Sequence, residues 1–184
     1  RCGKLIVSTE TDEEERLCEI REKANANGVI DLEFWSSRKV KAEEPSVKAT
    51  LALFSPSTGV VNSHDSMTSY VADIEACGGM FIGGSLVRHI EPVNERFIVN
   101  CNLEGESYNF ECGVLVNSAG LGAQALAENI AGLDQSIVPK LHYCRGNYFV
   151  LAGKAAFSHL IYPVPERSGA GLGVHATIDM AGQV

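Results

Sequence analysis

The stretch Val114-Leu-Val-Asn-Ser-Ala-Gly-Leu-Gly122 combines an apolar run, a group of small residues and the start of a helical pattern. An apolar strand that ends in small residues and leads into a helix lets the backbone approach a bound ligand closely. Taken alone, the pattern fits two structures equally well. One is the bed of a nucleotide or flavin, and the other is an ordinary tight turn between a strand and a helix.

The composition of the whole chain defines the class of protein. The 184 residues are 45% hydrophobic and 21% charged, which is typical of a folded globular protein. The formal net charge is −8, with 23 acidic residues against 15 basic ones. This balance argues against nucleic acid as a partner, because phosphate binding needs a surface rich in Lys and Arg. No apolar stretch approaches the roughly 20 residues that span a bilayer.

The cysteines show no spacing that indicates chemistry. None of them forms a C-x-x-C pair, and no histidine cluster has zinc-ligand spacing, so no metal site is predicted. We interpret the cysteines as small buried apolar residues in a reducing compartment, the cytoplasm or the mitochondrion. They are Cys2, Cys18, Cys77, Cys101, Cys112 and Cys144.

Hydrophobic periodicity and turn residues predict an α+β fold. One helix begins at a cap on Thr11 and ends at Asn27-Gly28, and a second begins at Ser63 or Asp65 and ends at Gly78-Gly79. A third follows the small residues Ser118–Gly122 and runs to about Asn129. Asn94-Glu95 and Glu104-Gly105 are hairpin signals. Strands are predicted over 4–9, 29–35, 48–54, 80–83, 85–91, 96–103, 106–112, 114–117, 148–151, 160–164 and 172–180.

Four stretches, in order along the chain, resemble the D-amino-acid oxidase superfamily of FAD-dependent oxidoreductases. The first-quoted stretch, extended to Ala127, resembles its second flavin-contacting motif. The other three resemble the L-2-hydroxyglutarate dehydrogenase family within that superfamily. They are Ser55–Asn62, Tyr143–Phe149, and Leu160–Pro165 leading to Gly171-Leu-Gly-Val-His175. Four ordered matches are more specific than any one of them.

The resemblance implies a mixed β-sheet substrate domain with helices, together with part of a Rossmann-like FAD-binding domain. The expected boundaries are 1–79 for a portion of the substrate domain, 80–131 for part of the FAD-binding domain, and 132–184 for a return to the substrate domain. The implied cofactor is FAD and the implied partner is a small carboxylate substrate, with quinone and oxygen both open as electron acceptors. The implied reaction oxidises the C2 hydroxyl of a short hydroxyacid.

The sequence also departs from the family. The family opens with a strand and a G-x-G-x-x-G turn that holds the pyrophosphate of FAD, and it closes with a further flavin-contacting segment. Neither pattern is found in this sequence, and both ends of the chain look cut. We therefore expect this chain by itself to bind FAD weakly or not at all, and to be inactive in isolation.

The resemblance also implies roles for individual residues. His175 is the expected base, and Arg145 with Tyr148 is the expected clamp for a substrate carboxylate. His64 either faces the substrate or only opens the helix. A backbone contact to adenine is expected at Val87. The expected flavin bed is Asn117, Ser118, Ala119, Gly120 and Leu121.

Several alternatives remain open at this point. His175 and Tyr148 fit ordinary core residues, and packing is the favoured role of Tyr162. A further alternative keeps the implied fold and changes the substrate to glycine, sarcosine, another amino acid or glycerol 3-phosphate. His142 and Cys144 are close enough in sequence to form a nucleophilic pair, although no orienting group is apparent. A non-enzymatic, β-rich ligand-binding module is the remaining alternative.

Overall fold

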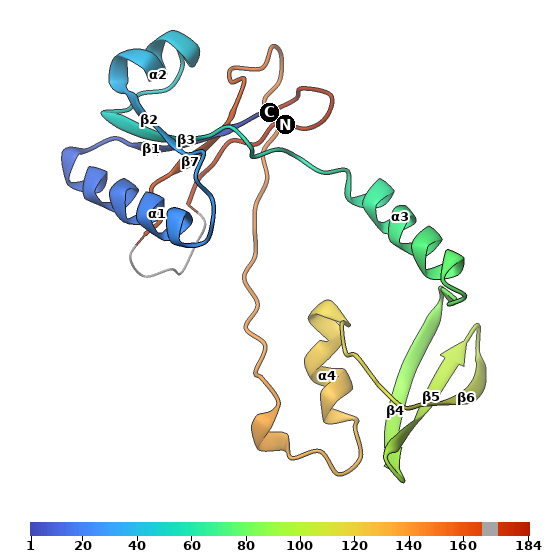
Figure 1. Cartoon of the computed structure of the whole chain (residues 1–184). Helices are drawn as coiled ribbons and strands as arrows, with labels where there is room; N and C mark the ends of the chain where they lie inside the picture. The colour runs from blue at the N-terminus through green and yellow to red at the C-terminus, as the bar shows by residue number, and fades with distance from the viewer. Residues whose placement is uncertain (167–172) are drawn as a thin grey trace. The chain divides into compact units, whose positions relative to one another are not determined.

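The computed structural model describes residues 1–166 and 173–184 (Figure 1). The described chain divides into two compact units. Unit 1 comprises residues 1–67 and 148–184, and unit 2 comprises residues 68–147. The helix α3 (Ser63–Ala76) contains the first boundary between the two units. The sequence predicted boundaries at 79/80 and 131/132, and the assignment of each part to substrate or flavin binding stays a prediction.

Unit 1 contains a four-stranded mixed sheet. Its strands are β1 (Lys4–Ser8), β2 (Glu33–Ser36), β3 (Leu51–Ser55) and β7 (Leu160–Pro163), in the order β2-β3-β1-β7. β3 is antiparallel to both β2 and β1, whereas β7 is parallel to β1. The sheet therefore joins the first strand of the chain to a strand more than 150 residues later.

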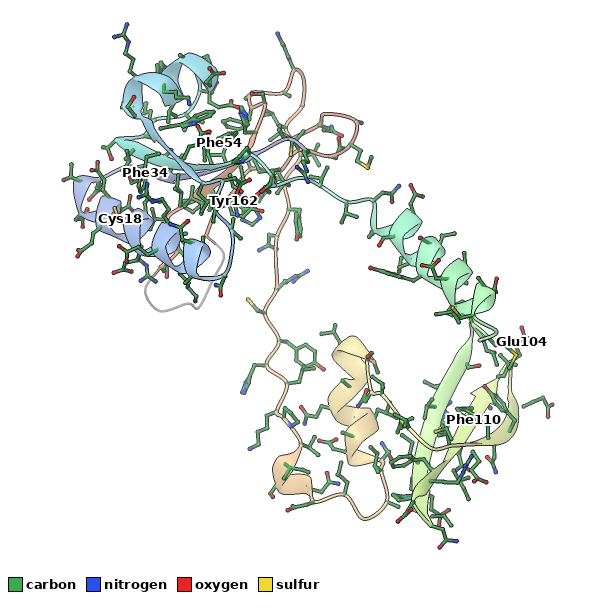
Figure 2. The ribbon with its side chains drawn as sticks, viewed as in Figure 1. Cys18, Phe34, Phe54, Glu104, Phe110 and Tyr162 are labelled. Atoms are coloured by element: carbon green, nitrogen blue, oxygen red, sulfur yellow. The ribbon has the colours of Figure 1, made fainter. Side chains whose placement is uncertain are left out.

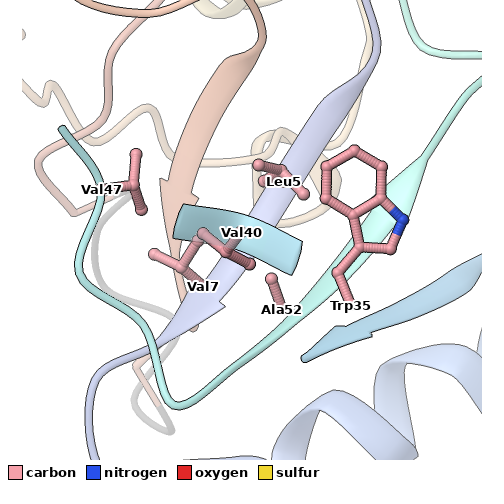
Figure 3. Packing of buried hydrophobic residues seen from close by; sticks show 6 residues of the cluster. All are labelled: Leu5, Val7, Trp35, Val40, Val47 and Ala52. Atoms are coloured by element: carbon pink, nitrogen blue, oxygen red, sulfur yellow. The ribbon is translucent and has the colours of Figure 1, made fainter. Parts of the chain in front are cut away.

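Two helices cover opposite faces of this sheet (Figure 1). Side chains alternate along β1, so Leu5 and Val7 lie on the face that packs against α2 (Ser37–Glu43). Lys4 and Ile6 lie on the other face, beside α1 (Glu14–Ala26). The core on the α2 side is shown in Figure 3 and consists of Leu5, Val7, Trp35, Val40, Val47 and Ala52.

Unit 2 is built on a three-stranded antiparallel meander. Its strands are β4 (Ser85–Val93), β5 (Arg96–Leu103) and β6 (Glu106–Cys112). Ile90, Val99 and Cys101 form its buried centre. The backbone of Ile90 also bonds the segment after α4 (Ala123–Glu128), because its N–H donates to the carbonyl of Asn129 and its carbonyl accepts from Ala131. Unit 2 also has two short 3-10 turns, Gly120–Gly122 and Gln135–Ile137, and unit 1 has one, Thr11–Glu13.

The prediction of an α+β fold with a mixed sheet is confirmed, and β5 and β6 have the predicted bounds. Two predicted helix caps are wrong. The N-cap of the first helical segment is Glu10, and Thr11 is its first residue. The Glu13 carboxylate accepts from the Glu10 backbone N–H. Asn62 caps α3, because its Oδ1 accepts from the backbone N–H groups of His64 and Asp65.

Other predicted elements are also wrong. The strand expected over 29–35 forms only at Glu33–Ser36, and α2 was not predicted at all. Residues 80–83, 114–117 and 148–151 do not form strands. Their apolar side chains fit a strand pattern, but a strand also needs a hydrogen-bonding neighbour, and no described strand pairs with these three segments. The strand expected over 172–180 lies partly outside the described residues, and its described part contributes one bridge, from Ile161 to Ala176.

Candidate functional site

His175 lies beside the edge of the unit 1 sheet. The backbone of Ala176 exchanges two hydrogen bonds with Ile161 of β7, at 3.0 and 2.9 Å. This pairing sets the imidazole of His175 against the ring of Tyr162, whose side chain is labelled in Figure 2. The two ring centroids are 4.6 Å apart and the ring planes differ by 9°. His175 and Tyr162 are therefore stacked face to face.

The backbone two residues before His175 has a conformation that requires glycine. Gly173 has φ +67°, a left-handed conformation that other residues adopt only with strain. A Cβ at this position would lie 2.7 Å from Cγ of Pro163, so a side chain would collide with the end of β7. Gly171 and Leu172, the first residues of the quoted Gly-Leu-Gly-Val-His motif, lie outside the described residues.

The imidazole of His175 has one hydrogen bond that determines its tautomer. Nδ1 lies 3.2 Å from the carbonyl oxygen of Gly173, which can only accept. Nδ1 therefore carries the proton in the neutral ring, and the lone pair is on Nε2. Within the described part of the chain, no group hydrogen-bonds to Nε2. In the neutral ring, Nε2 is therefore the nitrogen that can accept a hydrogen bond.

Lys4 belongs to the same face of the sheet, although its sequence context did not single it out. Its Nζ lies 5.6 Å from the centroid of the Tyr162 ring. Tyr162 was expected to serve packing, yet it lies in contact with both a cation and an imidazole. The available sequence signal was a lysine at the start of a buried strand, directly before the apolar residues Leu5-Ile-Val7.

The residues predicted to contact the flavin, Asn117–Leu121, form a loop in unit 2 that is held by hydrogen bonds of the Asn117 side chain. The side chain of Asn117 donates to the carbonyl of Ala123 at 2.8 Å and accepts from the backbone N–H of Ala119 at 3.2 Å. Gly120 has φ +56°, with no atom within 4 Å of a Cβ built on it. Ser118 and Leu121 are exposed. The loop thus presents small residues and open backbone, which a flat ligand can approach.

Val87, the expected site of the adenine contact, lies in β4 opposite Cys101 of β5. Its side chain packs against the buried centre of unit 2. The strand register shifts between Val87 and His89, which indicates a bulge.

The remaining predicted residues are exposed. Arg145 and Tyr148 lie in a segment without regular structure, with Arg145 in unit 2 and Tyr148 in unit 1. Tyr148 is 87% exposed, and its hydroxyl has no hydrogen-bond partner among the described residues. His64 is exposed in the first turn of α3.

The cysteines differ from the prediction. Only Cys101 is buried; Cys2 and Cys112 are half-buried, and Cys18, Cys77 and Cys144 are exposed. All six are free thiols. The described residues contain no group of three or more His, Cys, Asp or Glu side chains that would hold a metal ion. Within the same residues, no helix is both long and apolar enough to cross a bilayer.

Comparison with known sequences gives a match over the full chain. The profile of the family described as "FAD dependent oxidoreductase" matches residues 1–184. The mitochondrial L-2-hydroxyglutarate dehydrogenase of Arabidopsis thaliana is 33% identical over 214 residues, which cover 100% of this chain and 44% of the relative. The mitochondrial human enzyme of the same name is 32% identical, with 41% of it covered, and the Escherichia coli K12 enzyme is 30% identical, with 42% covered. The chain thus spans less than half the length of these relatives.

Comparison with solved structures gives a common fold. The L-α-glycerophosphate oxidase of Mycoplasma pneumoniae, solved with FAD bound, matches 99% of this chain and 47% of its own with a TM-score of 0.72 at 18% identity. The L-proline dehydrogenase of P. horikoshii matches 98% of this chain and 46% of its own, with a TM-score of 0.73 at 15% identity. The glycine oxidase of Bacillus cereus matches 91% of this chain and 46% of its own, with a TM-score of 0.62 at 19% identity.

Proposed function

We propose, since the chain belongs to the family of FAD-dependent oxidoreductases, that its protein oxidises the C2 hydroxyl of a short hydroxyacid to a ketone. The proposed substrate and product are L-2-hydroxyglutarate and 2-oxoglutarate. The names of the curated relatives, which are 30–33% identical across the whole chain, support this substrate. The activity belongs to the whole protein, because the chain spans less than half of each relative.

The observation that carries this proposal is the tautomer of His175. With the proton on Nδ1 donated to Gly173, Nε2 offers a lone pair that no described group occupies. In the proposed reaction Nε2 accepts the proton of the C2 hydroxyl. Stacking on Tyr162 holds the ring plane, so the direction of the lone pair is fixed before the substrate binds.

The FAD family assignment fits the loop in unit 2. When bound, FAD supplies the acceptor for the hydride that leaves C2 with two electrons. The residues proposed to contact it are Asn117, Ser118, Ala119, Gly120 and Leu121, because their loop has exposed backbone and small side chains. The proposed adenine contact stays at the backbone of Val87.

Arg145 and Tyr148 remain the proposed clamp for the C1 carboxylate. Both side chains are exposed, and Arg145 makes no ion pair with a described carboxylate, so its guanidinium is available for a bidentate contact. The role of His64 stays open between a substrate contact and helix initiation.

A second candidate keeps the cofactor and changes the substrate. The three enzymes of similar structure are named for glycerophosphate, proline and glycine, but identities of 15–19% support only the fold. An amine or a glycerol phosphate is therefore the alternative substrate. A non-enzymatic ligand-binding module is the alternative without flavin chemistry.

The test is anaerobic flavin reduction in the intact protein. We expect visible flavin absorption bands that bleach with L-2-hydroxyglutarate, and that persist with D-2-hydroxyglutarate, glycine or glycerol 3-phosphate. His175→Asn should slow the bleaching by at least about 100-fold, the usual contribution of a positioned base.

Each alternative has its own outcome. Bleaching by glycine or glycerol 3-phosphate alone would support the second candidate. A protein that carries no flavin when purified or reconstituted would support the binding module. An unchanged rate in His175→Asn would reject the role of His175 while leaving the substrate assignment intact.

A further inference from the structure

Lys4 is a cation on the α1 face of the unit 1 sheet without a matching acid. In the described residues, no carboxylate lies within ion-pair distance of its amine. Among the described residues, the amine contacts the ring of Tyr162, at 5.6 Å from Nζ to the centroid. Such a contact between an ammonium and an aromatic ring is weak where solvent reaches it. The amine therefore retains the capacity to bind an anion.

The same side chain lines a cavity. The cavity has a volume of about 390 Å³, which lies within the range of small-ligand sites. Its polar wall is formed by Lys4, Ser55, Ser57 and Thr58, and the hydroxyl of Thr58 donates to Ser55 Oγ at 2.8 Å. Apolar side chains from the sheet and from α1, including Ile6, Leu53 and Ile20, form the rest. This combination suits a small acid with a short hydrocarbon chain.

Lys4 and His175 are linked through one ring. The Lys4 amine and the His175 imidazole both contact Tyr162, so their separation is no greater than the sum of the two distances, 5.6 and 4.6 Å. In the proposed reaction His175 contacts the C2 hydroxyl, and C2 of a five-carbon diacid is joined to the distal carboxyl carbon by three bonds of about 1.5 Å each. With a hydrogen bond at each end, one such molecule is long enough to contact both residues.

We propose that Lys4 binds the second carboxylate of the substrate and makes the protein selective for short dicarboxylic hydroxyacids. This inference rests on the proposed function, because it requires His175 to act on the same molecule. Lysine suits the role because its ammonium is a compact charge on a flexible chain, able to form charge-assisted hydrogen bonds with a carboxylate. A substrate with an apolar end would leave this ammonium without its anion.

The experiment compares two substrates in the intact flavoenzyme. L-2-hydroxyglutarate has the distal carboxylate, whereas L-2-hydroxypentanoate has the same carbon chain and lacks it. Lys4→Met removes the charge and keeps a long side chain. We expect kcat/KM for L-2-hydroxyglutarate to fall about 10–100-fold, chiefly through KM, because a hydrogen bond to a charged group contributes about 1.5–3 kcal/mol. The value for L-2-hydroxypentanoate should stay within about twofold.

Further variants separate charge from structure. Lys4→Arg should keep most of the activity on the diacid. Lys48→Met removes an exposed lysine from the same unit and should change neither substrate's kinetics. If Lys4→Met does not fold, Lys4→Gln serves in its place. Flavin content, read from the visible spectrum, should be equal in all variants.

Binding without turnover gives an independent readout. Glutarate has both carboxylates and no hydroxyl, so its dissociation constant, measured by calorimetry, does not depend on catalysis. Lys4→Met should weaken glutarate binding about 10–100-fold. Equal losses on both substrates, or unchanged glutarate binding, would overturn the role of Lys4 and leave only its packing on Tyr162. A wild-type flavin that no hydroxyacid reduces would instead reject the proposed function.

Discussion

The carboxylate of Glu44 lies 2.6 Å from Nδ1 of His159, a residue 115 positions further along the chain. The same oxygen, Oε1, accepts from the backbone N–H groups of Ser158 and His159, both at 2.9 Å, and from the Ser158 hydroxyl at 2.5 Å. Glu44 is only 1% exposed. These four contacts join the end of α2 to the residues that lead into β7.

This arrangement predicts a large effect of Glu44→Ala on stability. The alanine would leave two backbone N–H groups and a partly exposed imidazole without their acceptor. We expect the free energy of unfolding of the intact protein to fall by about 3 kcal/mol, because several buried or partly buried donors lose a charged acceptor. The neighbouring Glu43 is exposed, so Glu43→Ala should change stability by less than about 0.5 kcal/mol. Equal effects of the two changes in denaturant titrations would contradict the prediction.

The same contacts predict how stability depends on pH. Burial by itself raises the pKa of Glu44, but the hydrogen bonds from Ser158 and His159 outweigh burial and hold the pKa below its ordinary value. A carboxyl with a lowered folded-state pKa stabilises the fold above its unfolded-state pKa of about 4.3. This stabilisation is lost as the pH falls through the lower folded-state pKa.

The measurement is the free energy of unfolding from pH 6 downward, in wild type and in Glu44→Gln. Below the ordinary glutamate pKa, wild-type stability should fall more steeply than that of Glu44→Gln, because glutamine has no proton to gain. Glu43→Gln should follow the wild-type curve. Parallel curves for wild type and Glu44→Gln would show that Glu44 does not contribute to the acid sensitivity.

Local signals made part of the fold predictable from sequence. The bounds of β5 and β6 follow from alternating apolar residues and from two hairpin turns, all within 20 residues. In contrast, α2 buries only Val40 among its seven residues, so it has no periodic stripe. It forms because Ser36 Oγ accepts from the backbone N–H of Lys39 and because Val40 packs on the sheet. The second of these causes is a tertiary contact that no local pattern contains.

The candidate site, like the fold, was predictable from the sequence only in part. Resemblance singled out His175, but its stacking on Tyr162 depends on the pairing of Ala176 with β7. The position of Lys4 depends on the parallel register of β1 and β7, in which Lys4 lies opposite Leu160 and Ile6 opposite Tyr162. Register between strands so distant in sequence is set by packing, and a single sequence does not reveal it.

The centre of unit 2 gives a third prediction. Ile90 is fully buried and bonds the segment after α4 through its backbone. Ile90→Ala should lower the free energy of unfolding by about 3 kcal/mol, through lost apolar burial and an unfilled cavity. The matched control is Ile30→Ala, because Ile30 is 84% exposed and should cost less than about 0.5 kcal/mol. A cost below about 1 kcal/mol for Ile90→Ala would mean that the surrounding residues collapse into the space.

The two hairpin turns give the last prediction, because they have the same backbone and different residues. Asn94 and Glu95 have φ of 47° and 64°, and Glu104 and Gly105 have φ of 51° and 97°. Positive φ at both central residues is typical of a type I′ turn, whose second position favours glycine. Because Glu95 has a Cβ, this left-handed conformation costs it about 1–2 kcal/mol relative to glycine. Glycine loses more conformational entropy on folding, which offsets part of that difference. We therefore expect Glu95→Gly to raise the free energy of unfolding by about 0.5–1 kcal/mol.

The reverse change in the second hairpin is the control. Gly105→Ala should lower the free energy of unfolding by about 1 kcal/mol, since it introduces a Cβ at φ 97°. No atom lies within 4 Å of that Cβ, so a loss there reflects backbone strain and not a collision. Glu95 also forms no ion pair with a described residue, so its replacement removes no attraction that would offset the gain. If Glu95→Gly instead destabilises the protein, the entropy of glycine in the unfolded chain exceeds the strain at Glu95.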